Sequence, residues 1–159
     1  MPNWREVRVL FCDVDGVLTD GGIYFGPDGQ VFKRFNVLDG YGIRRLMENG
    51  IHVVFVSGDD SPIVWARARR LGVREVYTGV EDKALVVKHV LERLGLGPEQ
   101  ACFIGDDSMD VPAMKLVGVA VSVANAHPSA LRAADYVTQR PGGHGAVREI
   151  CDLILGAEQ

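Results

Sequence analysis

A short segment near the start of the chain limits most strongly what this sequence can fold into. Residues 7–12 are mostly β-branched and other apolar residues and predict a buried strand, which ends abruptly at Asp13 and Asp15. Side chains alternate along a strand, so both carboxylates leave its end on one side, and Gly16 lets the chain turn away at once. Two carboxylates held together at the mouth of a parallel sheet favour a bound cation. The alternative interpretation is that Asp15-Gly16 is an ordinary turn and Asp13 a helix cap.

Strands and helices alternate along the rest of the chain. The sequence predicts further strands over residues 51–56, 75–77, 101–104, 119–123 and 136–137. It predicts a helix that opens at Asp39 and is closed by Asn49-Gly50, and further helices from Pro62 to Leu71, from Lys83 to Leu94, after Asp110 through Val117 and from Ala146 to Leu155. No linker or repeat divides them, so we expect residues 1–159 to form a single α/β domain, doubly wound and Rossmann-like, with a mainly parallel sheet.

A β-hairpin is predicted as an insertion after the first strand. Residues 21–25 and 31–35 are aromatic, alternating segments on either side of a Pro-Asp-Gly turn. Tyr24, Phe25 and Phe32 would be costly to expose together, which favours an interface over an ordinary solvated ribbon.

Composition excludes several classes of partner. The net charge of −4 supplies no basic surface for nucleic acid or an acidic membrane. Cys12, Cys102 and Cys151 lie in apolar runs without metal-ligand spacing, so we expect reduced core residues. The sequence has neither a targeting segment nor an apolar run of membrane-spanning length, and we expect a cytoplasmic protein.

Polar side chains gather where the predicted strands end, the edge at which open α/β sheets bind ligands. They are Asp13, Asp15, Ser57, Asp106, Asp107 and Asp110. Lys83, at a helix start on the same side, can reach in. Each residue taken singly has a plausible structural role, but the ordered set makes a purely structural explanation improbable.

The chain here resembles the haloacid dehalogenase superfamily of phosphotransferases. The matching segments are Asp13-Val14-Asp15-Gly16, Ser57-Gly58, Lys83 and Gly105-Asp106-Asp107-Ser108-Met109-Asp110. The resemblance implies that Asp13 is the nucleophile and Asp15 the general acid and base, while Ser57 and Lys83 hold the phosphoryl oxygens. It implies that Asp13, Asp106 and the Asp15 backbone carbonyl bind Mg²⁺, with Asp107 or Asp110 completing or orienting that shell.

Elementary chemistry agrees with those roles. A carboxylate is a weak nucleophile and a phosphomonoester is anionic, so attack needs a cation that cancels the repulsion and aligns the two partners. Mg²⁺ suits an all-oxygen, carboxylate-rich site. Asp15 must keep its side chain off the metal so that it can give a proton to the leaving alkoxide and later take one from water. An aspartyl phosphate is the implied intermediate.

Three longer segments are similar to the 3-deoxy-D-manno-octulosonate 8-phosphate phosphatases. They are residues 13–25, 35–43 and 142–149. The resemblance implies an enzyme that hydrolyses a 2-keto-3-deoxy sugar acid phosphate and lacks a cap domain. It also implies a homotetramer in which the hairpin and the C-terminal tail of a neighbour complete each active site.

One residue departs from that family's pattern. Asp59 follows Ser57-Gly58, where the octulosonate phosphatases usually carry an arginine suited to a substrate carboxylate. An acidic residue there resembles sibling phosphatases that act on nine-carbon, sialic-type 9-phosphates and keep basic residues on the following helix. Arg67 and Arg70 are then candidate substrate-binding residues, with surface charge as the alternative. A non-catalytic regulatory domain of the same fold is a further alternative, although such domains tend to lose the motif residues kept here.

Overall fold

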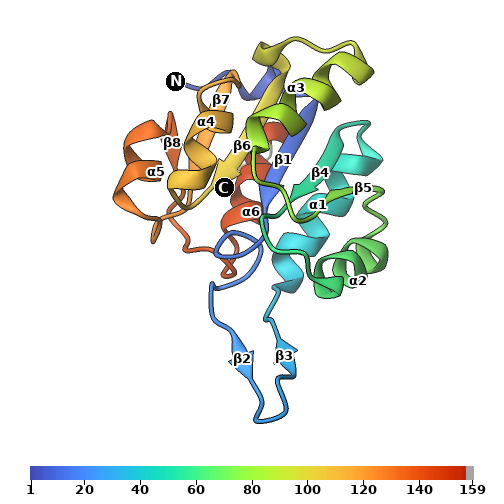
Figure 1. Ribbon diagram of the computed structural model, residues 1–159. Helices are drawn as coiled ribbons and strands as arrows, with labels where there is room; N and C mark the ends of the chain where they lie inside the picture. Colours follow the sequence, from blue (N-terminus) through green and yellow to red (C-terminus); the bar gives the residue numbers. More distant parts are fainter. Residues whose placement is uncertain (157–159) are drawn as a thin grey trace.

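A six-stranded parallel sheet forms the centre of the molecule. The computed structural model describes residues 1–156, and its strands lie in the order β5-β4-β1-β6-β7-β8 (Figure 1). All five neighbouring pairs in this sheet are parallel. The bounds are β1 Val9–Asp13, β4 His52–Val56, β5 Glu75–Tyr77, β6 Ala101–Gly105, β7 Val119–Ser122 and β8 Tyr136–Val137. The predicted doubly wound α/β fold is confirmed.

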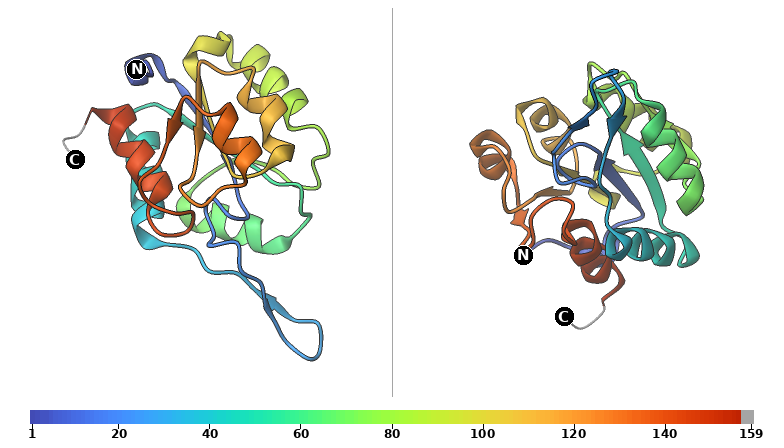
Figure 2. Two further views of the ribbon diagram at one scale, coloured as in Figure 1. Left: turned by 90° about the vertical axis from the view of Figure 1, so that its left-hand side faces the viewer. Right: turned by 90° about the horizontal axis from the view of Figure 1, so that it is seen from below.

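Helices cover both faces of the sheet (Figure 2). One face carries α1 Val37–Glu48, α2 Pro62–Leu71 and α6 Ala146–Leu155, and the other carries α3 Lys83–Leu94, α4 Val111–Met114 and α5 Pro128–Ala133. Short 3-10 helices cover Trp4–Glu6 (η1), Pro98–Gln100 (η2) and Ser108–Asp110 (η3). None of the helices within residues 1–156 is long and apolar enough to cross a membrane.

Alternation along β1 decides which way its terminal carboxylate points. Val9 and Phe11 pack with the residues of α3, whereas Leu10 and Cys12 pack with those of α1 and α6. Asp13 lies two residues after Phe11 and therefore emerges on the α3 face, where Lys83 begins its helix.

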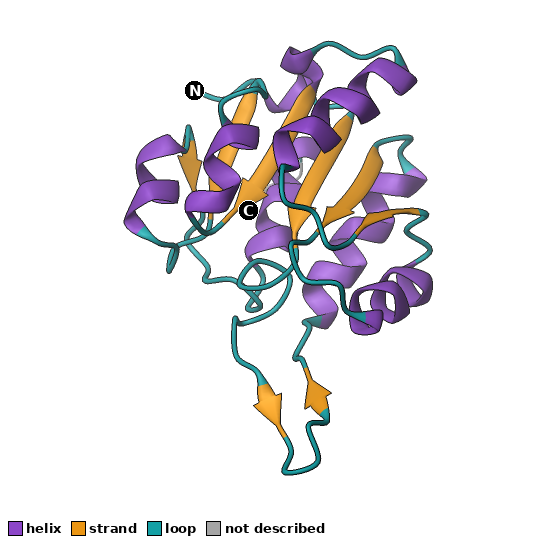
Figure 3. Ribbon diagram, viewed as in Figure 1, coloured by secondary structure: helices purple, strands orange, loops and turns teal. Residues whose placement is uncertain are grey.

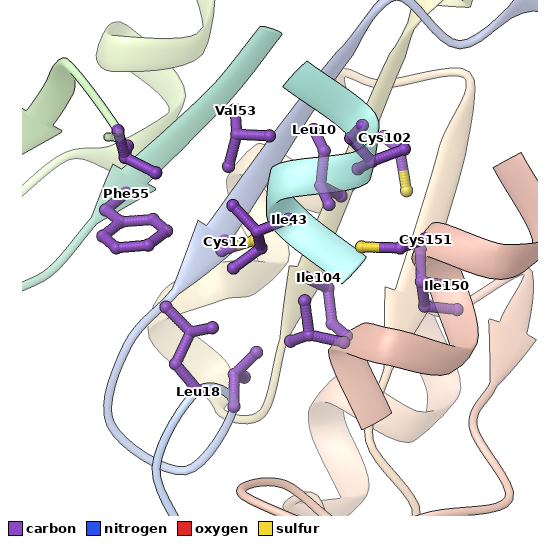
Figure 4. Packing of buried hydrophobic residues seen from close by; sticks show 14 of the residues in the cluster. Leu10, Cys12, Leu18, Ile43, Val53, Phe55, Cys102, Ile104, Ile150 and Cys151 are labelled. Carbon is purple, nitrogen blue, oxygen red and sulfur yellow. The ribbon is translucent and has the colours of Figure 1, made fainter. Parts of the chain in front are cut away.

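The three cysteines are free and buried, as predicted. Cys12, Cys102 and Cys151 lie among Leu10, Ile43 and Ile150 in the core between the sheet and α1 and α6 (Figure 4). Burial raises the pKa of each thiol, which keeps it protonated and unreactive.

The predicted hairpin extends away from the rest of the molecule (Figure 3). Its antiparallel strands are β2 Tyr24–Phe25 and β3 Val31–Phe32, and a single bridge joins Thr19 to Phe35 at its base. The paired part is shorter than the predicted arms. No cap domain accompanies it in the described residues.

Two helix predictions need correction, and one helix was not predicted. α1 begins at Val37 rather than Asp39, because the Asn36 side chain accepts the Leu38 N–H and caps the helix two residues earlier. α4 ends at Met114 rather than Val117, since the chain turns there and the Gly118 N–H bonds to the Pro98 carbonyl. The helix that was not predicted is α5, in which His127 is the N-cap and Pro128 the first helical residue.

Candidate active site

The carboxyl ends of β1, β4 and β6 lie side by side, because these strands are parallel neighbours. Asp13 ends β1, Ser57 follows β4 and Asp106 follows β6. The chain moves outward from β1 in one direction to β4 and β5 and later returns to the other side at β6. This reversal creates a crevice at the strand ends, the usual ligand site of such sheets.

A buried lysine holds two carboxylates at the base of this crevice. Lys83 Nζ lies 2.9 Å from Asp13 Oδ1 and 2.7 Å from Asp110 Oδ1, and all three side chains are buried. Asp82 caps α3 by accepting the Leu85 N–H, which fixes the first turn that carries Lys83. The Lys83 ammonium therefore faces Asp13, the predicted nucleophile.

Asp110 is fully engaged by its own chain. Its Oδ2 accepts the backbone N–H groups of Asp106 (2.9 Å) and Asp107 (3.2 Å), while Oδ1 accepts Lys83. Asp110 thus holds both the loop after β6 and the Lys83 side chain in place. Asp107 is turned to its own loop, where its Oδ1 accepts the Ser108 N–H.

The donor set fits a divalent cation. One carboxylate oxygen from each of Asp13, Asp106 and Asp110 lies within 4.8 Å of the other two. Burial, followed by the charge of Asp110, raises the pKa of Asp13 against the lowering effect of Lys83. Burial also raises the pKa of Asp106, with further raising by Asp110 and Asp107. This negative charge is under-compensated, and oxygen ligands of this kind suit Mg²⁺.

Gly16 is required by the close approach of two loops. Its φ is +83°, and a Cβ there would overlap the Asp106 carboxylate and lie 2.9 Å from Asp106 Cγ. Thr19 fixes the same turn, because its Oγ1 accepts the N–H groups of Gly16 and Gly21. The turn after β1 can therefore approach the Asp106 carboxylate this closely only with glycine at position 16.

The crevice opens as a cavity of about 610 Å³. Its lining includes Asp13, Asp15, Gly58, Asp59, Lys83, Asp106 and Asp107. Ser57 is buried and does not line the cavity itself, but it directly precedes Gly58, which does, and its Oγ accepts the Asp59 N–H at 3.1 Å. The structure therefore brings together the residues that the sequence motifs single out.

Lys33 is a residue at this site that the sequence analysis missed. Its Nζ lies 2.8 Å from Asp15 Oδ1 and 2.8 Å from Asp59 Oδ2. Burial alone lowers the pKa of Lys33, but hydrogen bonds and charges from the two aspartates outweigh it and raise the pKa above its ordinary value. The available signal was a lysine within the predicted second hairpin arm, residues 31–35, since a hairpin returns its chain to the strand end that it left.

Arg67 and Arg70 lie elsewhere in the chain's own fold. Both line a separate groove of about 540 Å³ with Leu38, Arg44 and Arg148. Arg67 stacks on the Phe35 ring at 5.4 Å and donates to the Asn36 carbonyl. Their role in substrate binding stays a prediction.

The glycine-rich segment at residues 142–145 packs on the turn after β1 of the same chain. The Gly143 N–H donates to the Val17 carbonyl at 3.0 Å, and Arg34 donates to the Gly143 carbonyl at 2.7 Å. A Cβ on Gly142 would overlap the Gly16 carbonyl group. This part of the tail supports its own chain's site, and residues 157–159 lie outside the described part.

A Rossmann-like sheet that presents an Asp-x-Asp turn, a serine, a lysine and an acidic loop at its strand ends defines a hydrolase of the haloacid dehalogenase class. In agreement, the model of a family described as haloacid dehalogenase-like hydrolase matches residues 65–150, and the chain belongs to that family. A 3-deoxy-D-manno-octulosonate 8-phosphate phosphatase of Yersinia pestis is 49% identical over 153 residues, which cover 96% of this chain and 82% of the relative. Within the hydrolases, the chain therefore belongs to the family of these phosphatases.

Solved structures agree with this assignment. The crystal structure of the Yersinia pestis phosphatase has a TM-score of 0.93 and 48% sequence identity, covering 96% of this chain and 82% of that one. A phosphatase of the same name from Moraxella catarrhalis, in complex with a magnesium ion, a phosphate ion and a KDO molecule, has a TM-score of 0.93 at 35% identity. That match covers 98% of this chain and 89% of the other.

Proposed function

We propose that the protein is a Mg²⁺-dependent phosphatase that hydrolyses 3-deoxy-D-manno-octulosonate 8-phosphate to the free sugar acid and inorganic phosphate. One observation carries the proposal: Asp13, Lys83 and Asp106 line one cavity, and the buried Asp110 pairs with Lys83 within 4.8 Å of the two other carboxylates. Relatives that share 45% or more of this sequence carry that activity in their names.

Asp13 is the nucleophile in this proposal. The Val14 N–H and Lys83 bond to its Oδ1 at 2.8 and 2.9 Å, so Oδ2 is the oxygen left to attack phosphorus. The attack forms a bond between Asp13 Oδ2 and phosphorus and breaks the bond between phosphorus and the sugar oxygen. Lys83 lies beside the nucleophile, where its positive charge stabilises the charge that develops on the phosphoryl group.

Asp15 is the general acid and base. It lies on the turn after β1, its side chain is 42% exposed, and it lines the cavity. It protonates the leaving sugar alkoxide, and the resulting carboxylate then takes a proton from the water that attacks the phosphorylated Asp13. The same residue serves both steps because the first step leaves it in the form that the second requires.

Asp13, Asp106 and the Asp15 backbone carbonyl would hold Mg²⁺, and Asp110 would orient Asp106 and Lys83. When bound, the metal supplies positive charge that offsets repulsion between the carboxylates and the phosphoryl oxygens. Ser57 and the backbone of the cavity-lining Gly58 would contact the phosphoryl group.

Phosphate release tests the proposal. Wild-type protein with Mg²⁺ should release phosphate from octulosonate 8-phosphate, whereas chelation of the metal or the Asp13→Asn variant should abolish release. A preference for a nine-carbon 9-phosphate would transfer the assignment to the nonulosonate phosphatases. If no sugar phosphate is hydrolysed, a non-catalytic regulatory role is favoured.

The hairpin supports a proposed homotetramer. Four large apolar side chains are exposed on or beside it: Ile23 (64%), Tyr24 (54%), Phe25 (75%) and Phe32 (59%). A ribbon that projects from the molecule with such a surface fits against other copies of itself. In such an assembly the hairpin and C-terminal tail of a neighbour would close each cavity.

We also propose a cytoplasmic location. The three cysteines are unpaired and buried, which suits a reducing compartment.

A further inference from the structure

The base of the hairpin is tied across the mouth of the chain's own active site by one ammonium group. Lys33 Nζ lies 2.8 Å from Asp15 Oδ1 and 2.8 Å from Asp59 Oδ2. We propose that Lys33 is a positioning residue that aims the Asp15 carboxyl group at the leaving oxygen of the substrate, and that Asp59 is the counter-ion that holds Lys33 in place. The proposal rests on the phosphatase function proposed above.

Three separate parts of the chain meet at this contact. Asp15 lies on the turn after β1, Lys33 directly follows β3, and Asp59 lies on the loop after β4. The Lys33 side chain is only 3% exposed, whereas the side chains of Asp15 and Asp59 are 42% and 53% exposed. The cation is therefore covered and fixed, while both carboxylates remain open toward solvent and the cavity.

Asp15 has one side-chain anchor. Within residues 1–156, Lys33 is the sole hydrogen-bond partner of its carboxylate, and it contacts Oδ1. The other oxygen, Oδ2, is left free to carry the proton. A general acid works only within about 2.6–3.2 Å of the atom that it protonates, so a carboxylate free to rotate on an exposed turn would spend little time in position. The contact with Lys33 removes that freedom.

Asp59 ties the lysine to the phosphate-binding side of the cavity. Its Oδ2 accepts Lys33, and its backbone N–H donates to Ser57 Oγ at 3.1 Å. With its charge paired to Lys33, Asp59 acts within the protein and does not select the substrate. An acidic residue at this position is therefore compatible with an eight-carbon substrate.

Leaving-group dependence separates positioning from support of the fold. A sugar alkoxide needs a proton from Asp15 to leave, whereas 4-nitrophenolate leaves without one. Both substrates need Asp15 in the second step, when water is activated. Loss of Lys33 should therefore slow both steps for the sugar phosphate but only the second step for 4-nitrophenyl phosphate.

The experiment compares Lys33→Met, Lys33→Arg and Asp59→Asn with wild type, using Lys88→Met, an exposed lysine on α3, as the control. For Lys33→Met we expect kcat on octulosonate 8-phosphate to fall about 10- to 100-fold with KM little changed. Rapid mixing with 4-nitrophenyl phosphate should show a near-normal first turnover followed by slow turnover.

The other variants test the two halves of the proposal. Lys33→Arg should restore most of the activity, because arginine keeps the charge and can reach both carboxylates. Asp59→Asn should cause a smaller loss, about 3- to 10-fold, in the same steps and leave the preference between eight- and nine-carbon phosphates unchanged. Lys88→Met should match wild type.

Other outcomes overturn the proposal. An equal loss in the first turnover of both substrates would make Lys33 a support of the fold, and a raised KM with unchanged kcat would make it a substrate ligand. A changed eight- to nine-carbon preference in Asp59→Asn would make Asp59 a specificity residue. If wild-type protein does not hydrolyse octulosonate 8-phosphate, the proposed function fails. The positioning role of Lys33 is then tested with 4-nitrophenyl phosphate alone, from the rates of the first turnover and of the later turnovers.

Discussion

Replacing Gly16 by alanine should disrupt the metal site far more than it strains the backbone. Position 16 has φ +83°, a conformation that costs an L-residue about 1–2 kcal/mol. The added Cβ would also overlap the Asp106 carboxylate and lie 2.9 Å from its Cγ. The Asp106 carboxylate must therefore shift from its position in the acidic cluster, and we expect Mg²⁺ affinity to fall about 10- to 100-fold, the range found when support of a metal ligand is lost.

Gly29 provides a matched control for the cost of placing alanine at a positive φ. It also has φ +83°, but a Cβ there would meet nothing within 4 Å. Gly29→Ala should lower the free energy of unfolding by about 1–2 kcal/mol and leave Mg²⁺ binding unchanged. Titration calorimetry with Mg²⁺ and urea unfolding would measure both effects. Equal Mg²⁺ affinity in the two variants would refute the claim that Gly16 makes room for Asp106.

Three further predictions concern charge, pH and assembly. Lys83→Met leaves the Asp13 and Asp110 carboxylates in the interior without their cationic partner. Activity should therefore fall at least about 100-fold, and the free energy of unfolding, measured by urea titration, should fall by about 3–5 kcal/mol. Lys88→Met should change neither quantity. Because the pKa of Lys83 is raised in the folded protein, the stabilisation by this ion pair is fully present at pH values below 10.5, the ordinary pKa of lysine. A loss of unfolding free energy under about 1 kcal/mol in Lys83→Met at pH 7 would contradict the pairing. Burial raises the pKa of Asp39 from 3.8 to about 6, so between these pH values the native state holds a proton that the unfolded state has lost. The free energy of unfolding should therefore fall by about 2–3 kcal/mol as pH rises from about 4 to about 6. Asp39→Asn should flatten this pH dependence in urea titrations, and an unchanged pH dependence would assign the effect to another group. Phe25→Ser with Phe32→Ser should convert the proposed tetramer to smaller species in sedimentation, and a monomeric wild type would contradict the hairpin interface.

The central part of the site was predictable from the sequence for a definite physical reason. Parallel strands place their carboxyl ends at one edge, so Asp13, Ser57 and Asp106 had to lie together once the alternation of strands and helices was recognised. The period of β1 then places Asp13 on the same face as α3 and Lys83. Local patterns and sheet geometry suffice for both inferences.

Lys33 could not be found in this way. Its partners lie 18 and 26 residues away in sequence, and the contact depends on how the hairpin leaves the sheet edge. No periodicity encodes that direction. α5 was missed for a different reason: six residues opened by His127 and Pro128 are too short to show helical periodicity, and the proline suggested a loop.

Trapping of the intermediate tests the central claim most directly. Borohydride reduces an aspartyl phosphate to homoserine, and mass spectrometry of the digested protein locates the change. After rapid quenching of wild-type protein during turnover with Mg²⁺ and substrate, we predict homoserine at position 13 and none in a sample quenched without substrate. Homoserine at another aspartate, or turnover that persists in Asp13→Asn, would contradict the assignment of Asp13 as the nucleophile.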